Sequence, residues 1–286
     1  MKKLYDLSKK YPILVGIVGF WVIYLSFLHT PAAQDPNSYK EAVLRIILTI
    51  ACTGFIALIS GDKILINSSN KTAYGILMGI PLIMVNALVG ILDLILHLTD
   101  SEPLVQGWLP KTILLAIFYL SLGFFEETLF RALINDAILY QFRNKRGVFV
   151  AIALISSFIF GVVHVWGSDI YNLVTLAQAF LKTISGAIAG FLFLTVYWKT
   201  RNIVACAIIH GICDFSIVIA SELFTNAAEP EGYVMEGTTE LGTFTVDNGI
   251  AQCVTYGIQI ILLIIAVLIT LKFIKSIDFK KIREEW

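Results

Sequence analysis

The sequence YLSLGFFEETLFRALI, residues 119–134, places two adjacent glutamates and an arginine inside an otherwise apolar stretch. Each ionisable side chain at the centre of a membrane helix costs about 2.5 to 3.5 kcal/mol on insertion scales. Charged residues therefore occur in membrane helices mainly where they are paired with other groups or have a function. The stretch therefore predicts that Glu126, Glu127 and Arg131 are paired or functional within a membrane helix.

The composition of the whole chain indicates a polytopic membrane protein. Hydrophobic residues make up 57% of the 286 residues, charged residues make up 15%, and the mean hydropathy is +0.81. These values lie outside the usual range of soluble domains. The formal net charge is zero, so no overall field attracts nucleic acid, and no nucleic-acid partner is expected. Membrane lipid is an expected partner.

The apolar segments predict eight transmembrane helices, because a hydrocarbon core about 30 Å thick takes roughly 20 apolar residues per helix. We expect a single all-α transmembrane domain over residues 1–286, with a motif-bearing core at about 110–223. The expected spans lie near residues 12–29, 41–61, 73–98, 112–135, 147–166, 171–197, 202–223 and 249–274.

The basic residues predict the orientation of these spans through the positive-inside rule. With the N-terminus in the cytoplasm, the inner segments hold 16 of the 21 Lys and Arg residues, and the outer loops keep only Lys40 and Lys111. The prediction is therefore eight spans with both termini cytoplasmic, in the plasma membrane if the chain is prokaryotic. The long outer loop, residues 224–248, is interpreted as a solvated connector, with a lid over a site as the alternative.

Two further expected spans carry polar residues at helical spacing. The fifth contains FGVVH, with Phe160 and His164, and the seventh contains HGICD, with His210 and Asp214. Residues four apart project from one face of a helix, so His210 and Asp214 can converge on one point, and Phe160 can lie beside His164. Three helices thus each offer a polar face.

Helix geometry also separates the two glutamates. Successive residues point about 100° apart, so Glu126 and Glu127 cannot serve one point equally. Glu127 stands four residues before Arg131, which is the favourable order for an intrahelical ion pair. Glu126 keeps no obvious local partner, and it is therefore the better candidate for reacting chemistry.

These side chains together suit the hydrolysis of an amide by activated water. A buried carboxylate that faces a small aqueous pocket is suited to take a proton from water near neutral pH. Two neutral histidines opposite it can donate hydrogen bonds to a developing oxyanion, hold the water, or ligate a metal. Asp214 can orient His210 or share the water.

The motifs EExxxR, FxxxH and HxxxD, in this order on three separate spans, resemble those of the CPBP family of intramembrane proteases. That family includes the Ras-converting CAAX endopeptidases and bacterial relatives linked to bacteriocin processing and self-immunity, and the resemblance implies a peptide or membrane-protein substrate. The resemblance implies that Glu126 activates water, that Glu127 is its neighbour paired with Arg131, and that His164 and His210 are the two histidines. Asp214 stands where many relatives have Asn, and an aspartate adds charge where an amide would only hydrogen-bond.

The resemblance leaves two mechanisms open. Members of the family are commonly labelled metalloproteases, and a metal-free mechanism based on the glutamate has also been argued for the group. This sequence lacks HExxH, although His164, His210, Asp214 and Glu126 can supply the ligands of a zinc site. We expect glutamate-activated water without tightly bound zinc, with a divalent metal as the alternative.

Two other classes of function are weighed against a protease. A secondary transporter would use the buried acids as proton or cation sites, but it would show inverted repeats and interrupted helices, which we do not find in the sequence. A catalytically silent scaffold of the same family is the other alternative. All the motif side chains are present, so silence would have to come from their geometry.

Overall fold

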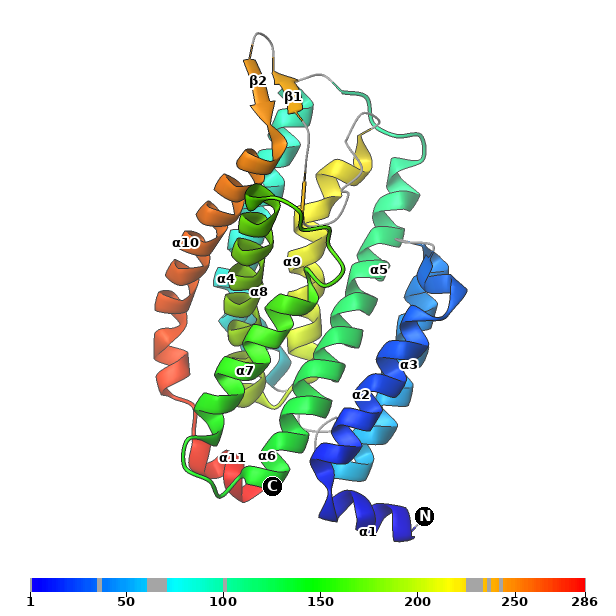
Figure 1. The fold of residues 1–286 in the computed structure, drawn as a ribbon, viewed down its shortest axis with the longest axis vertical. Coiled ribbons are helices and arrows are strands. Elements are labelled where there is room, and N and C mark those ends of the chain that lie inside the picture. The colour runs from blue at the N-terminus through cyan, green and yellow to red at the C-terminus, as the bar shows by residue number, and fades with distance from the viewer. Residues whose placement is uncertain are drawn as a thin grey trace.

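The structure is a computed structural model that describes residues 2–34, 38–60, 71–99, 102–224, 234–235, 238–241 and 244–285. Its long helices run side by side along one direction and form an elongated bundle (Figure 1). The helices are α1 (Lys2–Lys10), α2 (Pro12–Leu28), α3 (Tyr39–Ser60), α4 (Thr72–Thr99), α5 (Trp108–Glu127), α6 (Asp136–Phe142), α7 (Val148–Val163), α8 (Leu173–Thr200), α9 (Ile203–Leu223), α10 (Asn248–Lys275) and α11 (Phe279–Glu285). A π-helical segment, Thr128–Asn135, joins α5 to α6, and Pro31–Gln34 form a 3₁₀ turn.

Six of the described helices are long and apolar enough to cross a membrane, and the chain is an integral, multi-pass membrane protein. The six are α3, α4, the continuous helix Trp108–Phe142, α8, α9 and α10. Helices α2 and α7 are also apolar but have 17 and 16 residues, a length of roughly 25 Å. The crossing of these two helices, and with it the total of eight spans, stays a prediction.

Both chain termini lie at the same end of the bundle, beside α1 and α11 (Figure 1). Termini at one end agree with an even number of passages along the bundle, as the charge pattern predicts. That this end is cytoplasmic stays a prediction. Lys63, which the orientation argument also uses, falls in residues 61–70, outside the described residues.

Short polar side chains set where three of the long helices begin. The side chain of Asn172 accepts a hydrogen bond from the backbone N–H of Thr175 at the start of α8, and Asn202 does the same for Ala205 at the start of α9. Asp247 caps α10 in the same way. Each cap pairs a backbone donor that has no partner within the helix, so the chain turns into the bundle just after these residues.

Glycines let α5 and α9 approach backbone to backbone. A Cβ built on Gly123 of α5 would lie 2.3 Å from the carbonyl oxygen of Ala207, and one on Gly211 of α9 would lie 2.9 Å from the carbonyl oxygen of Tyr119. Small residues at a helix crossing allow this kind of close contact in membranes. Because Gly211 directly follows His210, the crossing brings the seventh expected span against the glutamates of α5.

Glycines also allow close contact between α7 and α8. A Cβ on Gly161 would lie 2.1 Å from the carbonyl oxygen of Thr183, and one on Gly190 would lie 2.9 Å from the ring of Phe160. Phe160 and His164 of α7 are thereby held against α8, near the α5–α9 crossing.

The outer loop contains a short β-hairpin, which the all-α prediction did not include. Strands β1 (Thr238–Leu241) and β2 (Phe244–Asp247) pair antiparallel, with Thr238 opposite Asp247. The hairpin leads directly into α10, beyond the end of the bundle (Figure 1). Residues 225–233, 236–237 and 242–243 of this loop lie outside the described residues, and the alternative of a lid therefore stays a prediction.

Candidate active site

The ion pair expected between Glu127 and Arg131 is present and wholly buried. Nε of Arg131 lies 3.2 Å from Oε2 of Glu127, and the two side chains are 1% and 0% exposed. Nη2 of Arg131 donates to the backbone oxygen of Gly190 at 3.4 Å, and the guanidinium carbon lies 4.2 Å from the ring centroid of Phe160. The pair thus connects the π-helical segment to α8 and α7, and it offsets the burial of both charges.

Glu127 has a second partner that the sequence did not predict. Its Oε1 lies 2.9 Å from Nδ1 of His210, on α9. A carboxylate that is already paired with Arg131 can only accept, so the hydrogen of this bond sits on Nδ1 of His210. Glu127 therefore holds the orientation of the His210 ring, and Nε2 is the nitrogen that faces the other motif residues.

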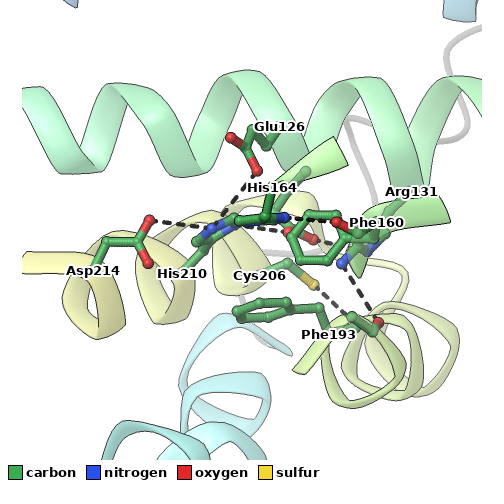
Figure 2. Close-up of polar contacts among 10 residues, drawn as sticks. Glu126, Arg131, Phe160, His164, Phe193, Cys206, His210 and Asp214 are labelled. Atoms are coloured by element: carbon green, nitrogen blue, oxygen red, sulfur yellow. Dashed lines mark hydrogen bonds and ion pairs between the residues drawn. The ribbon is translucent and has the colours of Figure 1, made fainter. Parts of the chain in front are cut away.

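Nε2 of His210 faces two carboxylates. It lies 3.3 Å from Oδ2 of Asp214 and 3.9 Å from Oε2 of Glu126. Figure 2 marks both contacts with dashed lines. Oε2 of Glu126 is a buried atom without a hydrogen-bond partner, although the Glu126 side chain as a whole is 22% exposed. The ring of Phe193 stacks on His210 at 4.7 Å between centroids and covers one face of the imidazole. The structure thus brings Glu126, His210 and Asp214 together.

His164 lies at the end of α7 rather than within it. The expected span ran to residue 166, but α7 ends at Val163 and a turn follows. Nδ1 of His164 lies 2.6 Å from the backbone oxygen of Phe160, and its ring lies edge-on to the Phe160 ring at 4.7 Å. A carbonyl oxygen can only accept, so Nδ1 carries the hydrogen, and a neutral His164 presents Nε2 as an acceptor.

Glu126 and His164 line one cavity of about 200 Å³. The other residues that line it are Tyr24, Phe27, Arg45, Leu122, Phe125, Leu129, Phe130 and Val163. The walls are thus mainly apolar, with one carboxylate, one imidazole and one guanidinium among them. A larger apolar cavity of about 900 Å³ lies among α7, α8 and α10, but no motif residue lines it. We place the candidate active site at the smaller cavity, because Glu126 and His164 line it; His210 and Asp214 do not line it, and His210 adjoins it through its contact with Glu126.

The sequence interpretation missed Arg45 as a neighbour of this cavity. Arg45 and Glu41 form an ion pair on α3, at 2.6 Å. The sequence EAVLR, residues 41–45, repeats the spacing of ETLFR, residues 127–131. The sequence could therefore have predicted a second Glu-x-x-x-Arg ion pair. It could not have predicted that α3 packs against α5.

The described residues do not form a three-ligand metal site. No group of three His, Cys, Asp or Glu side chains among the described residues is placed to hold a metal ion. Nδ1 of His210 is taken up by Glu127, and its Nε2 lies 3.3 Å from Oδ2 of Asp214 and 3.9 Å from Oε2 of Glu126. The expected zinc ligands His164, His210, Asp214 and Glu126 form no such group in this arrangement of the described residues, and we derive no step through a metal.

Comparison with known proteins identifies the segment that carries the motifs. Residues 107–216 match the family model described as "Type II CAAX prenyl endopeptidase Rce1-like". Neither the curated proteins nor the solved structures that were compared gave a match to the chain. The matched segment runs from the start of α5 to just beyond Asp214 and so includes all three motifs. On this match and the order of its motifs, residues 107–216 are similar to the CPBP family of CAAX-type intramembrane proteases.

Proposed function

We propose that this chain is an intramembrane endopeptidase that hydrolyses a peptide bond with water activated by Glu126, assisted by His164, His210 and Asp214. One observation carries the proposal. Oε2 of Glu126 is a buried carboxylate oxygen without a hydrogen-bond partner, beside a cavity that His164 also lines. A buried acceptor of this kind needs a donor, and a water molecule in the cavity would provide one.

The catalytic side chains have separate roles in the reaction of that water. Glu126 takes a proton as the water oxygen attacks the carbonyl carbon, and it later passes the proton to the leaving amine. His164 presents Nε2 as an acceptor, which suits it to orient the attacking water. With a proton on Nε2 as well, His210 donates to the oxyanion of the tetrahedral intermediate, while Glu127 and Asp214 hold the ring in place.

The substrate class follows from the family and from the apolar surroundings of the site. We propose a membrane-associated peptide or single-span protein, cut in CAAX-type processing or in bacteriocin processing or self-immunity. The aromatic and aliphatic walls of the cavity suit apolar side chains next to the bond that is cut.

An isosteric substitution tests the assignment of Glu126. We expect Glu126→Gln to lower peptide cleavage by about 10²- to 10⁴-fold, the usual contribution of a general base. Membrane peptides from cells that make wild type or Glu126→Gln are compared by mass spectrometry, with size-exclusion chromatography to confirm that both proteins assemble. Glu284→Gln, at an exposed glutamate of α11, is the matched control. Peptide profiles that are identical for wild type and Glu126→Gln would contradict the proposal and favour a silent scaffold.

Metal removal tests the alternative mechanism. Because the proposed scheme draws on Glu126 alone for the proton transfer, we expect dialysis of the purified protein against a chelator to leave cleavage within about twofold of the starting rate. The metal content of the same samples is measured by inductively coupled plasma mass spectrometry. Loss of activity that returns on addition of stoichiometric zinc would replace the glutamate scheme with a metallo-endopeptidase mechanism.

A further inference from the structure

Arg45 is a charged residue that lines the Glu126 cavity and that the proposed hydrolysis does not use. It lies on α3, a helix apolar and long enough to cross the membrane, and the residue is 8% exposed. Its Nη2 lies 2.6 Å from Oε1 of Glu41, one turn earlier on the same helix. This pairing occupies one nitrogen of the guanidinium and balances its charge, but it does not provide an acceptor for the other two nitrogens.

Those two nitrogens, Nε and Nη1, are buried and have no hydrogen-bond partner. The guanidinium carbon lies 4.5 Å from the ring centroid of Phe118 and 5.2 Å from that of Phe27, which also lines the cavity. Aromatic faces stabilise the positive charge, but they do not satisfy N–H donors that point in the plane of the guanidinium. An acceptor at either nitrogen would therefore remove part of an uncompensated cost of burial.

Arg131, the arginine of the other Glu-x-x-x-Arg pair, differs from Arg45 in what its nitrogens contact. Nε and Nη1 of Arg131 also make no hydrogen bond, but Nε lies 3.2 Å from Oε2 of Glu127. Its Nη2, however, donates to the backbone oxygen of Gly190, and Arg131 does not line the cavity. Of these two Glu-x-x-x-Arg pairs, the one on α3 is the one that borders the space beside Glu126.

The chemistry of the cavity points to an anion, and in particular to a carboxylate. Among its lining residues, Arg45 is the one with a permanent positive charge, and Glu126 carries the opposite charge. A carboxylate that entered near Glu126 would be repelled by it, and a guanidinium in the same cavity offsets that repulsion. The anionic groups that a peptide carries are carboxylates, and a nitrogen of the guanidinium can donate to one oxygen of such a group.

We propose that Arg45 binds a carboxylate of the peptide substrate and thereby selects peptides that carry this group near the bond to be cut. The inference rests on the proposed hydrolysis at Glu126 and names a specificity-determining residue for it. The carboxylate belongs either to the C-terminus of the peptide or to an Asp or Glu side chain. Both sources present the same planar anion to Arg45.

A binding experiment separates this inference from the hydrolysis. Glu126→Gln protein in lipid nanodiscs is incubated with four pools of N-acetylated hexapeptides of random sequence. The pools are free acids or C-terminal amides, each made with or without Asp and Glu, and the retained peptides are quantified by mass spectrometry. We expect pools with a carboxylate to be retained about tenfold more than the amidated pool without acidic residues. Retention confined to free acids assigns the C-terminus, and retention of the acidic amidated pool assigns the side chain.

Variants of α3 then assign the preference to Arg45. We expect Arg45→Gln to abolish the preference and Arg45→Lys to restore part of it, because lysine keeps the charge but not the planar fork. Lys40→Gln, at an exposed cation on the same helix, should leave it unchanged. Since Arg45→Gln removes the cation that balances the charge of buried Glu41, the double variant Glu41→Gln/Arg45→Gln provides a charge-balanced form.

Two results would overturn the inference. One is equal retention of all four pools by protein with its native Arg45, and this result needs no folded variant. The other is a preference that persists in a folded Arg45→Gln or double variant. Neither depends on hydrolysis, so a failure of the Glu126→Gln cleavage test and a failure of carboxylate selection are distinguishable.

Discussion

Two neighbouring residues of the same type, Glu126 and Glu127, occupy different environments. Glu127 is buried between Arg131 and His210 and contacts both, whereas Glu126 turns one oxygen toward His210 at 3.9 Å and borders the cavity. The cause is the rotation of about 100° per residue along a helix. A single helical step therefore separates a structural carboxylate from one that is available for chemistry.

Removal of one partner from the buried pair should be far more costly than removal of both. We expect Arg131→Met to destabilise the protein by about 3 to 5 kcal/mol, because Glu127 is left as a buried charge without its cation. The double variant Glu127→Gln/Arg131→Met should recover much of this loss. Thermal unfolding in detergent measures both. Equal stability of the single and double variants would contradict the interpretation of Glu127 as the ion-pair partner of Arg131.

Asp214 contacts His210 through an oxygen, which an asparagine would retain. Oδ2 of Asp214 lies 3.3 Å from Nε2 of His210, so Asp214→Asn keeps an acceptor at this place and should lower cleavage by less than about tenfold. Asp214→Ala removes the acceptor and should lower cleavage by about 10- to 100-fold, the loss expected for an orienting hydrogen bond to a charged group. Cleavage rates of the two variants are compared at equal protein. An equally large loss in both variants would contradict this expectation and show that the negative charge itself matters.

At the scale of the elements, the site depends on helices that cross without side chains between them. The crossing of α5 and α9 at Gly123 and Gly211 sets the distance from the glutamates to His210, and the crossing of α7 and α8 at Gly161 holds Phe160 and His164. The π-helical segment Thr128–Asn135 begins directly after Glu127 and carries Arg131. π-helical turns occur often at functional sites, where they change the direction of the side chains that follow.

An added methyl group at the α5–α9 crossing should disturb the site without touching its chemistry. A Cβ on Gly123 would lie 2.3 Å from the carbonyl oxygen of Ala207, so Gly123→Ala must push the helices apart. We expect a loss of about 1 to 3 kcal/mol in stability together with reduced cleavage, measured on the same preparation. Gly54→Ala is the matched control, since nothing lies within 4 Å of its added Cβ. Full activity of Gly123→Ala would show that the site tolerates a wider crossing.

At the scale of the whole molecule, the topology rests on whether α2 and α7 cross the membrane. We expect both to cross, because the termini lie at one end of the bundle and the basic residues follow an alternating pattern. Single cysteines placed before and after α7, at Lys145 and Tyr171, should then react with a membrane-impermeant maleimide from opposite sides. The pair Lys9 and Thr30 tests α2 in the same way, in a Cys253→Ser background because Cys253 is partly exposed. Labelling of both members of a pair from one side would reduce the number of spans.

Much of the architecture was predictable because each long helix is a long apolar segment in its own sequence. The eight expected apolar segments all appear as helices, with ends within a few residues of the prediction for most of them. The ion pair of Glu127 with Arg131 was also predictable, because both residues lie on one helix at a known spacing. The β-hairpin was not, because a loop rich in polar residues shows no periodicity that distinguishes a short pair of strands from a connector.

A count of basic residues along the sequence does not show which of them pair with acidic residues in the folded protein. Arg201 counts as an inner-loop cation in the orientation argument, yet it is 7% exposed and its Nη1 donates to Asp136 at 3.2 Å. Asp136 also accepts from Tyr197 Oη at 2.5 Å. These contacts connect the first residue of α6 to the C-terminal end of α8. The pairing joins residues 65 positions apart, and only the fold brings them together.

The amino-acid sequence by itself determined the membrane class, the approximate spans, the three motifs and the split between the two glutamates, since these depend on hydropathy and on geometry within one helix. The tertiary structure decided which nitrogen of His210 faces Glu127, that His164 and Glu126 share a cavity, and that Arg45 borders it. These contacts arise from side chains on different helices, whose approach is set by glycine crossings and packing. No local pattern in the sequence encodes the rotation of one helix relative to another.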